Sequence, residues 1–376
     1  MCSNIVSKMR FALVWSLVLL LLAPCPATVT AAAFAPEIHL LNDRSSDIIG
    51  AAPLQLPGLA VPAGLSGAGV IVGLADSGLD KGSISDIHPD LQSESGRMPR
   101  VAMLKSYTDR AVPDDPIGHG THMAGIIAGS GASSNGQYRG IAPGASLYFQ
   151  SLLDKNGQIS VPARLESLFA PAYSAGVRVH VDGWGGGANA YGSNAAQIDK
   201  FVYEHPDFLP IFGAGNSGPA HSTLTTEGNS KNALVVGASQ VPRPAFSEEA
   251  QKAGMVAASS SRGPAAGGRI KPDLIAPGSA VISTCSRLTA SNYPANSAYT
   301  RLGGSSMAAA VTGGASALLL EYLDVGEGIK KPSSALLKAL LINGARLESA
   351  PANSQGFGIL DIFGTIMGLK HKKTVY

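Results

Sequence analysis

The chain has 376 residues, of which 45% are hydrophobic and 14% are charged, and its formal net charge is +2. This apolar content is sufficient for a large folded core, which excludes an intrinsically disordered chain. The near-neutral charge excludes an electrostatic surface for nucleic acid or for an anionic membrane as the main means of binding. The 45 glycines follow no collagen-like period and predict many tight turns.

Residues 1–33 have the pattern of a secretory signal peptide. Lys8 and Arg10 precede and border a 13-residue apolar run at 11–23, and small residues at 29–33 offer a cleavage site. This run is shorter than the roughly 20 residues that a membrane-spanning helix needs, although a signal anchor stays open as an alternative. We therefore expect a secreted, extracellular protein without stable membrane association.

Cleavage after residue 33 would change both the charge and the cysteine content. The segment removed carries Lys8 and Arg10 but no acidic residue, so the remaining chain would be close to neutral. Of the three cysteines only Cys285 would remain, and one cysteine cannot form an internal disulfide. We expect a monomer that is stabilised by its core, with no nucleic acid among its partners.

The rest of the chain is interpreted as one domain between two short segments. Residues 34–62 are mixed in polarity and contain prolines, which suggests an N-terminal arm laid over the domain surface. The domain spans 63–362, since no internal repeat or long linker divides it. Residues 363–376, with a basic run at 370–373, are expected to form a solvated C-terminal tail.

A strand at 70–75 is almost entirely apolar, as expected for a strand that is buried on both faces of a parallel sheet. Strands and helices then alternate with short links, which predicts an α/β fold with a mainly parallel central sheet between two helical layers. Right-handed crossovers would bring the carboxyl ends of the strands to one edge of this sheet. Further strands are expected at 146–150, 177–181, 209–212 and 233–236, and helices at 119–128, 161–175, 194–205 and 306–320.

Three side chains that could act together lie at the ends of these elements. Asp76 follows the first strand, His119 opens a helix of small residues, and Ser306 follows two glycines at the start of an apolar helix. A histidine can take the proton of a serine hydroxyl, and a carboxylate can hold that histidine in the required tautomer. Taken singly, Asp76 could be a turn residue and Ser306 a helix cap. His122 has no Glu or Cys beside it and is interpreted as structural.

Four motifs in this order resemble those of the subtilisin family of serine proteases (subtilases, peptidase family S8). The resemblance covers about 42–362, and residues 173–185 are similar to the oxidatively stable alkaline branch of the family. It implies the subtilisin-like, three-layer α/β/α fold. The motifs are Ala75-Asp76-Ser77-Gly78, Gly118-His119-Gly120-Thr121-His122, Gly213-Ala214-Gly215-Asn216-Ser217-Gly218 and Gly304-Ser305-Ser306-Met307-Ala308.

The resemblance implies a role for each residue of the site. Asp76 would orient His119, which would act as general base and then as general acid, and Ser306 would form an acyl-enzyme. The side chain of Asn216 and the backbone N–H of Ser306 would form the oxyanion hole. The implied function is a secreted endopeptidase that cleaves polypeptide substrates without a cofactor for catalysis.

The substrate site is expected between two glycine-rich segments. Trp184, Gly185 and Gly186 would pair with an extended peptide through main-chain hydrogen bonds. The opposite pocket wall would come from Gly213, Ala214 and Gly215, with Thr225 near the floor. These segments carry no obvious charge, which predicts broad specificity with a preference for apolar side chains.

The chain departs from the family pattern at several positions of the site. Ser305 stands where relatives usually have threonine, and Ala310 replaces a proline that follows the nucleophile. Residues 182–183 are Asp-Gly instead of Asn-Ser, which would alter the substrate-facing segment. Residues 226–227 are Thr-Glu where relatives carry a cis-proline turn, and a non-proline cis bond costs about 2.5–4 kcal/mol. We therefore expect a reshaped pocket floor.

Two further family features bear on stability. The stretch 88–91 resembles a calcium-site motif, with Asn135 as a second ligand, but two oxygens are fewer than the six to eight that calcium takes, which leaves a structural calcium ion open. Subtilases usually carry a pro-segment that assists folding, and residues 34–62 are too few for one. We expect the chain to fold unaided or with a partner, unless the sequence is incomplete.

Two alternative functions compare with the endopeptidase as follows from the sequence. An esterase of the α/β-hydrolase type would need Gly-x-Ser-x-Gly and the order Ser, Asp, His, whereas the serine comes last here. A catalytically weak or inactive peptide-binding scaffold stays open, because of Ala310, Glu227 and the short segment ahead of the domain.

Overall fold

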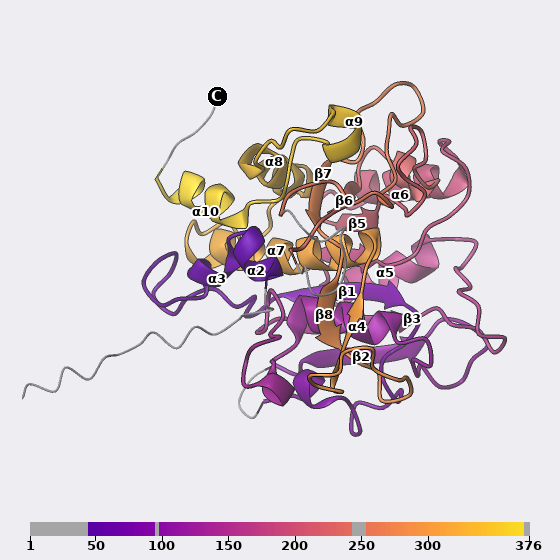
Figure 1. Ribbon diagram of the computed structural model, residues 1–376, viewed down its shortest axis with the longest axis vertical. Helices are drawn as coiled ribbons and strands as arrows, with labels where there is room; N and C mark the ends of the chain where they lie inside the picture. The colour runs from indigo at the N-terminus through magenta and orange to yellow at the C-terminus, as the bar shows by residue number, and fades with distance from the viewer. Residues whose placement is uncertain (1–43, 95–97, 243–252, 372–376) are drawn as a thin grey trace, which may run out of the picture. The chain divides into compact units, whose positions relative to one another are not determined.

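The computed structural model describes residues 44–94, 98–242 and 253–371, so the expected signal peptide at 1–33 lies outside the described residues (Figure 1). A parallel sheet of seven strands in the order β2-β3-β1-β4-β5-β6-β7 forms its centre. The α/β fold with a mainly parallel sheet is thereby confirmed. The strands are β1 (Ile71–Asp76), β2 (Val101–Ser106), β3 (Ser146–Ser151), β4 (Val179–Asp182), β5 (Leu209–Gly213), β6 (Leu234–Ser239) and β7 (Leu274–Pro277).

Helices cover both faces of the sheet. Because neighbouring side chains on a strand point to opposite faces, Val72 and Leu74 of β1 enter one core cluster and Ala75 enters another. The first cluster contains α4 (His119–Ala128) and α7 (Ser305–Val325), and the second contains α5 (Glu166–Ser174) and α6 (Ser193–Glu204). The other helices are α2 (Ser45–Ile48), α3 (Ala51–Leu54), α8 (Ser334–Gly344), α9 (Ala352–Gln355), α10 (Ile362–Lys370) and the 3-10 turns η1 (Pro89–Leu91), η2 (Ala132–Ser134) and η3 (Glu227–Asn229).

Helix α7 is the central helix of the described residues. It is long and apolar enough to cross a membrane, but 83% of its most apolar window is buried inside the fold, as expected for a core helix. Gly313 lets it lie close to the sheet, because a Cβ there would come within 2.3 Å of the Val181 side chain. Ala310 is fully buried within an unbroken helix, so the missing proline leaves α7 intact.

A second, two-stranded antiparallel sheet of β8 (Val281–Thr284) and β9 (Tyr299–Leu302) leads into α7. Its side chains bond to the backbone of α4: Ser283 donates to the His122 carbonyl at 2.8 Å, and Thr284 donates to the Thr121 carbonyl at 2.7 Å. This hairpin therefore connects the helix that begins at His119 with the segment that carries Ser306.

Two expected segment boundaries are wrong. Residues 363–370 are not a tail, because they continue α10, in which Ile362 and Ile366 are fully buried. The second half of the expected arm is not only a surface layer, since Ile49 and Leu54 are fully buried in the main core. The two segments meet where the Ile362 N–H donates to the Ile49 carbonyl at 2.9 Å. Such pairing between distant segments has no local sequence signal.

Candidate active site

Asp76 and His119 form the first pair of the site. Asp76 is the last residue of β1 and is 2% exposed, and His119 is the first residue of α4. The His119 Nδ1 donates to Asp76 Oδ1 at 2.7 Å, and the Ser77 N–H donates to the same oxygen at 2.7 Å. Burial lowers the pKa of His119, but the charge of Asp76 and the hydrogen bond to it outweigh this effect, so the pKa is raised above 6.5.

A second carboxylate, missed by the sequence analysis, lies behind this pair. Asp115 is fully buried and accepts hydrogen bonds from the Ser77 hydroxyl at 2.8 Å, the Gly118 N–H at 2.9 Å and both the N–H and the hydroxyl of Thr121. Burial and the charge of Asp76 raise the pKa of Asp115, against the lowering effect of Thr121 and Ser77. Asp115 thus ties the start of α4 to the end of β1.

Ser306 reaches the same place from α7. Its hydroxyl donates to the Gly183 carbonyl at 3.3 Å, a long bond that holds it weakly. Gly183 in turn borders the catalytic carboxylate candidate, since a Cβ at this position would lie 1.8 Å from Asp76 Oδ2. Only glycine fits at position 183 without displacing its neighbours. The glycine that departs from the family pattern therefore lies between Asp76 and Ser306.

Asn216 and Ser305 are held together beside Ser306. The Ser305 N–H donates to Asn216 Oδ1 at 2.9 Å, and the Ser305 hydroxyl accepts from the Gly215 N–H at 3.0 Å. With its oxygen engaged, Asn216 presents its NH₂ group away from Ser305. The Ser306 N–H lies in the first turn of α7, where the helix supplies no acceptor. The Asn216 NH₂ and the Ser306 N–H are the two donors expected for an oxyanion hole.

Two cavities share the segment 183–187 as a wall. The larger, of about 790 Å³, is lined by His119, Ile117, Ile159 and Val161. The smaller, of about 400 Å³, is lined by Ser306, Asn216 and Thr225 together with Gly213 and Gly215. Both sizes lie in the range of ligand pockets.

Most of the expected substrate residues line these cavities. Trp184, Gly185 and Gly186 border both of them. Ala214 is the exception: it is fully buried in a cluster with Leu224 and Val235, so it supports the pocket wall and does not form its surface.

His122, which was expected to be structural, and Asp182, which departs from the family pattern, both have defined partners. His122 is fully buried, its Nε2 lies 3.1 Å from the Val281 carbonyl, and burial lowers its pKa to about 3. His122 is therefore neutral, and its contact with Val281 packs β8 against α4. Asp182 is also fully buried and lies 3.0 Å from His180 Nδ1, on the face of the sheet that α5 covers.

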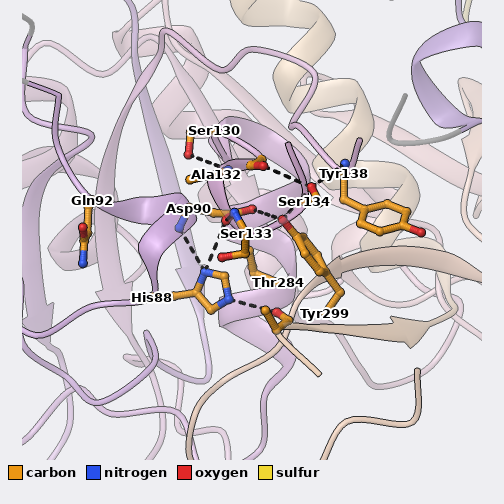
Figure 2. A network of polar contacts seen from close by, with 12 residues as sticks. His88, Asp90, Gln92, Ser130, Ala132, Ser133, Ser134, Tyr138, Thr284 and Tyr299 are labelled. Atoms are coloured by element: carbon orange, nitrogen blue, oxygen red, sulfur yellow. Dashed lines mark hydrogen bonds and ion pairs between the residues drawn. The ribbon is translucent and has the colours of Figure 1, made fainter. Parts of the chain in front are cut away.

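The expected calcium-site residue Asp90 is surrounded by hydrogen-bond donors (Figure 2). One carboxylate oxygen accepts from the Ser133 N–H at 2.8 Å and the other from the Tyr299 hydroxyl at 2.7 Å. His88 Nδ1 accepts from the Asp90 N–H at 3.2 Å, and its Nε2 lies 2.9 Å from the Ala298 carbonyl. Burial raises the pKa of Tyr299, so the phenol keeps its proton.

These residues do not fit a calcium ion. Both oxygens of Asp90 already face donor hydrogens, and the second expected ligand, Asn135, is exposed. Within the described ranges no group of three or more His, Cys, Asp or Glu side chains could hold a metal ion. Calcium takes six to eight oxygen ligands, whereas the two oxygens of Asp90 are already bonded to donors.

The family is decided by the match to known sequences. The pattern of the subtilase family (peptidase S8) matches residues 67–358. The chain belongs to the subtilase family of serine proteases. This subtilase is 34% identical to the serine protease AprX of Bacillus subtilis over 274 residues, which are 68% of this chain and 58% of AprX. The protein tagA of Dictyostelium discoideum, a serine protease/ABC transporter B family protein, is 28% identical over 400 residues.

Solved structures agree with this fold. The CspB protease of Clostridium perfringens has a TM-score of 0.69 at 16% identity and covers 88% of this subtilase, which in turn covers 98% of that chain. A lanthipeptide protease has a TM-score of 0.63 at 18% identity, with 88% and 94% covered. By contrast, this chain spans only 22% of the length of tagA.

Proposed function

We propose that this subtilase is an endopeptidase that cleaves peptide bonds through an acyl-enzyme on Ser306. The observation that carries the proposal is that Ser306 and Asp76 both approach Gly183, while Asp76 is hydrogen-bonded to His119. Ser306 Oγ would attack the scissile carbonyl carbon while its proton passes to His119 Nε2. The negative charge of the carbonyl oxygen would be stabilised by the Asn216 NH₂ and the Ser306 N–H.

The remaining steps follow from the same groups. His119 gives its proton to the leaving nitrogen as the C–N bond breaks, and the new amine departs. Water then loses a proton to His119 and attacks the acyl carbon, and the proton returns to Ser306 Oγ as the ester bond breaks. Asp76 stays ionised and stabilises the imidazolium in both halves of the reaction. The groups used all come from the chain, so we propose that catalysis needs no cofactor.

The larger cavity supports an apolar preference for substrate residues ahead of the cleaved bond. Ile117 and Ile159 are 49% and 42% exposed, and both line this cavity, so their apolar surface is available to a ligand there. Together with Val161 and Trp184 they would take apolar or aromatic side chains. The smaller cavity is lined by Thr223, Thr225 and other polar groups and would accept more varied side chains.

Localisation and the branch of the family rest on sequence patterns alone. The pattern of residues 1–33 supports secretion without stable membrane association, and the pattern of 173–185 supports the oxidatively stable alkaline branch.

A fluorophosphonate probe tests the proposed function. Wild-type protein should be labelled covalently, and Ser306→Ala should not, because Ser306 is the proposed nucleophile that attacks the phosphorus. Casein digestion by the wild type alone would separate a peptidase from an esterase. Labelling that persists in Ser306→Ala would exclude Ser306 as nucleophile, and a folded wild type without labelling would favour the inactive peptide-binding scaffold.

We also propose that the Asp90 region is stabilised by Tyr299 and not by calcium. Tyr299→Phe should lower the free energy of unfolding by about 1–3 kcal/mol, because it leaves a buried carboxylate oxygen without its donor. The melting temperature of the wild type should be the same in calcium and in a chelator. Tyr322→Phe is a matched control, since its hydroxyl donates to the exposed Glu327. A chelator that lowers the wild-type melting temperature would contradict the proposal.

A further inference from the structure

Glu227 is a buried carboxylate that the proposed mechanism does not use. It begins η3 and is 3% exposed. Its Oε2 accepts from the Gly186 N–H at 3.0 Å, and its Oε1 accepts from the Asn194 amide at 2.8 Å. Burial of a carboxylate is costly unless its oxygens are hydrogen-bonded. The two hydrogen bonds from Gly186 and Asn194 offset this cost.

The carboxylate lies directly behind the substrate-facing segment. A Cβ at Gly185 would come within 3.2 Å of Glu227 Oε2, and Glu227 itself lines the larger cavity beside Trp184 and Gly186. Asn194 comes from the first turn of α6. Glu227 therefore joins three pieces that are far apart in the sequence: the segment after β4, the turn η3 and helix α6.

Gly186 is held by both of its backbone groups. Its carbonyl accepts from the Thr226 N–H at 2.8 Å, while its N–H donates to Glu227. In an extended segment, neighbouring residues direct their backbone groups to opposite sides. In the part of the chain that the structure describes, Gly185 N–H and C=O have no hydrogen-bond partner. Fixing Gly186 on the inner side thus leaves Gly185 free to pair with a substrate strand.

We propose that Glu227 is a positioning residue that fixes the segment 184–187 as a template for extended peptides. The proposal rests on the proposed function only in assigning peptide binding to this segment. The carboxylate holds the Gly186 N–H inward, which presents the backbone of Gly185 at the groove before any substrate arrives. A pre-organised strand binds a peptide more tightly, because less conformational freedom is lost on binding.

Peptide binding to the Ser306→Ala protein tests this without depending on catalysis. A fluorescein-labelled apolar pentapeptide should bind about 10–100-fold more weakly when Glu227→Ala is added, the range expected for losing a hydrogen bond to a charged group. Glu227→Gln should restore most of the affinity, since its amide oxygen can still accept from Gly186. Hydrogen exchange of a peptide covering 184–187 should quicken in Glu227→Ala.

Glu321→Ala is the matched control for the loss of a buried carboxylate. Glu321 also accepts two backbone N–H bonds, from Ser66 at 2.7 Å and Gly67 at 2.6 Å, but it lies in α7 away from both cavities. The Glu321→Ala substitution should lower the melting temperature and leave the peptide affinity unchanged. In proteins that keep Ser306, Glu227→Ala should raise KM for the pentapeptide much more than it slows fluorophosphonate labelling, which does not need the segment.

Three results would overturn the proposal. They are unchanged affinity in a folded Glu227→Ala protein, equal weakening by Glu321→Ala, and the absence of any peptide binding to the parent. Failure of the proposed function is separate, because it would appear as a wild type that the fluorophosphonate does not label while the affinity and hydrogen-exchange results still stand.

Discussion

Asp76→Asn should lower kcat by about 10⁴-fold, the size known for the equivalent change in a serine protease of another fold. Asp76 Oδ1 accepts from His119 Nδ1 at 2.7 Å and so keeps the proton on this nitrogen, which leaves Nε2 free to accept the serine proton. An asparagine can turn its NH₂ group toward Nδ1 and stabilise the opposite tautomer. Initial rates on a peptide substrate, at saturating concentration, measure this loss.

The same substitution should move the pH dependence. The neutral form of His119 is the base, so activity should rise with pH through a pKa that lies above the ordinary value of 6.5. Without the charge of Asp76, burial lowers the pKa of His119 with less opposition, and the acid limb of kcat/KM should shift to lower pH. The rate of fluorophosphonate labelling against pH gives an independent measurement of this limb.

Asp114→Asn is the control for this prediction. Its carboxylate pairs with Arg110 at 2.7 Å near the surface, so the same chemical change there should alter activity by no more than about twofold. An Asp76→Asn protein that keeps kcat within tenfold of the wild type, or an acid limb that stays in place, would show that Asp76 does not orient His119.

The fold was predictable where residues close in sequence decide it. β1, β3 and β5 have apolar centres, and the structure places these strands within one residue of the expected bounds. β2 was missed because it is an edge strand: Ala102 and Lys105 are exposed, so its sequence lacks the continuous apolar pattern of a buried strand. The β8–β9 hairpin was missed because 14 residues separate its strands, at 285–298.

The site was predictable only in its short motifs. Asp76, His119 and Ser306 stand in motifs of a few residues, whereas Asp115 acts through Ser77, 38 positions away. Its position four residues before His119 was the one available signal. The role of Gly183 between Asp76 and Ser306 depends on the packing of β1, β4 and α7, which is a property of the assembled fold. Glu227 was noticed as a departure, but its bond to Gly186 spans 41 positions.

The second large effect is expected at Asn216. Asn216→Leu should lower kcat by about 10²–10³-fold with little change in KM, the range known for such a donor in a subtilisin. The reason is geometric: the Ser305 N–H engages Asn216 Oδ1 at 2.9 Å, so the amide cannot rotate freely and its NH₂ stays in place. The ground-state carbonyl gains little from this donor, whereas the oxyanion of the tetrahedral intermediate gains a full hydrogen bond.

Separate values of kcat and KM distinguish this role from substrate binding. Asn156→Leu makes the same chemical change at an exposed turn and should leave both values unchanged. Fluorophosphonate labelling should slow together with kcat in Asn216→Leu, since the phosphonyl oxygen also develops negative charge as Ser306 attacks. An increase in KM at constant kcat would instead assign Asn216 to the pocket wall, and the Ser306 N–H would then be the main donor to the oxyanion.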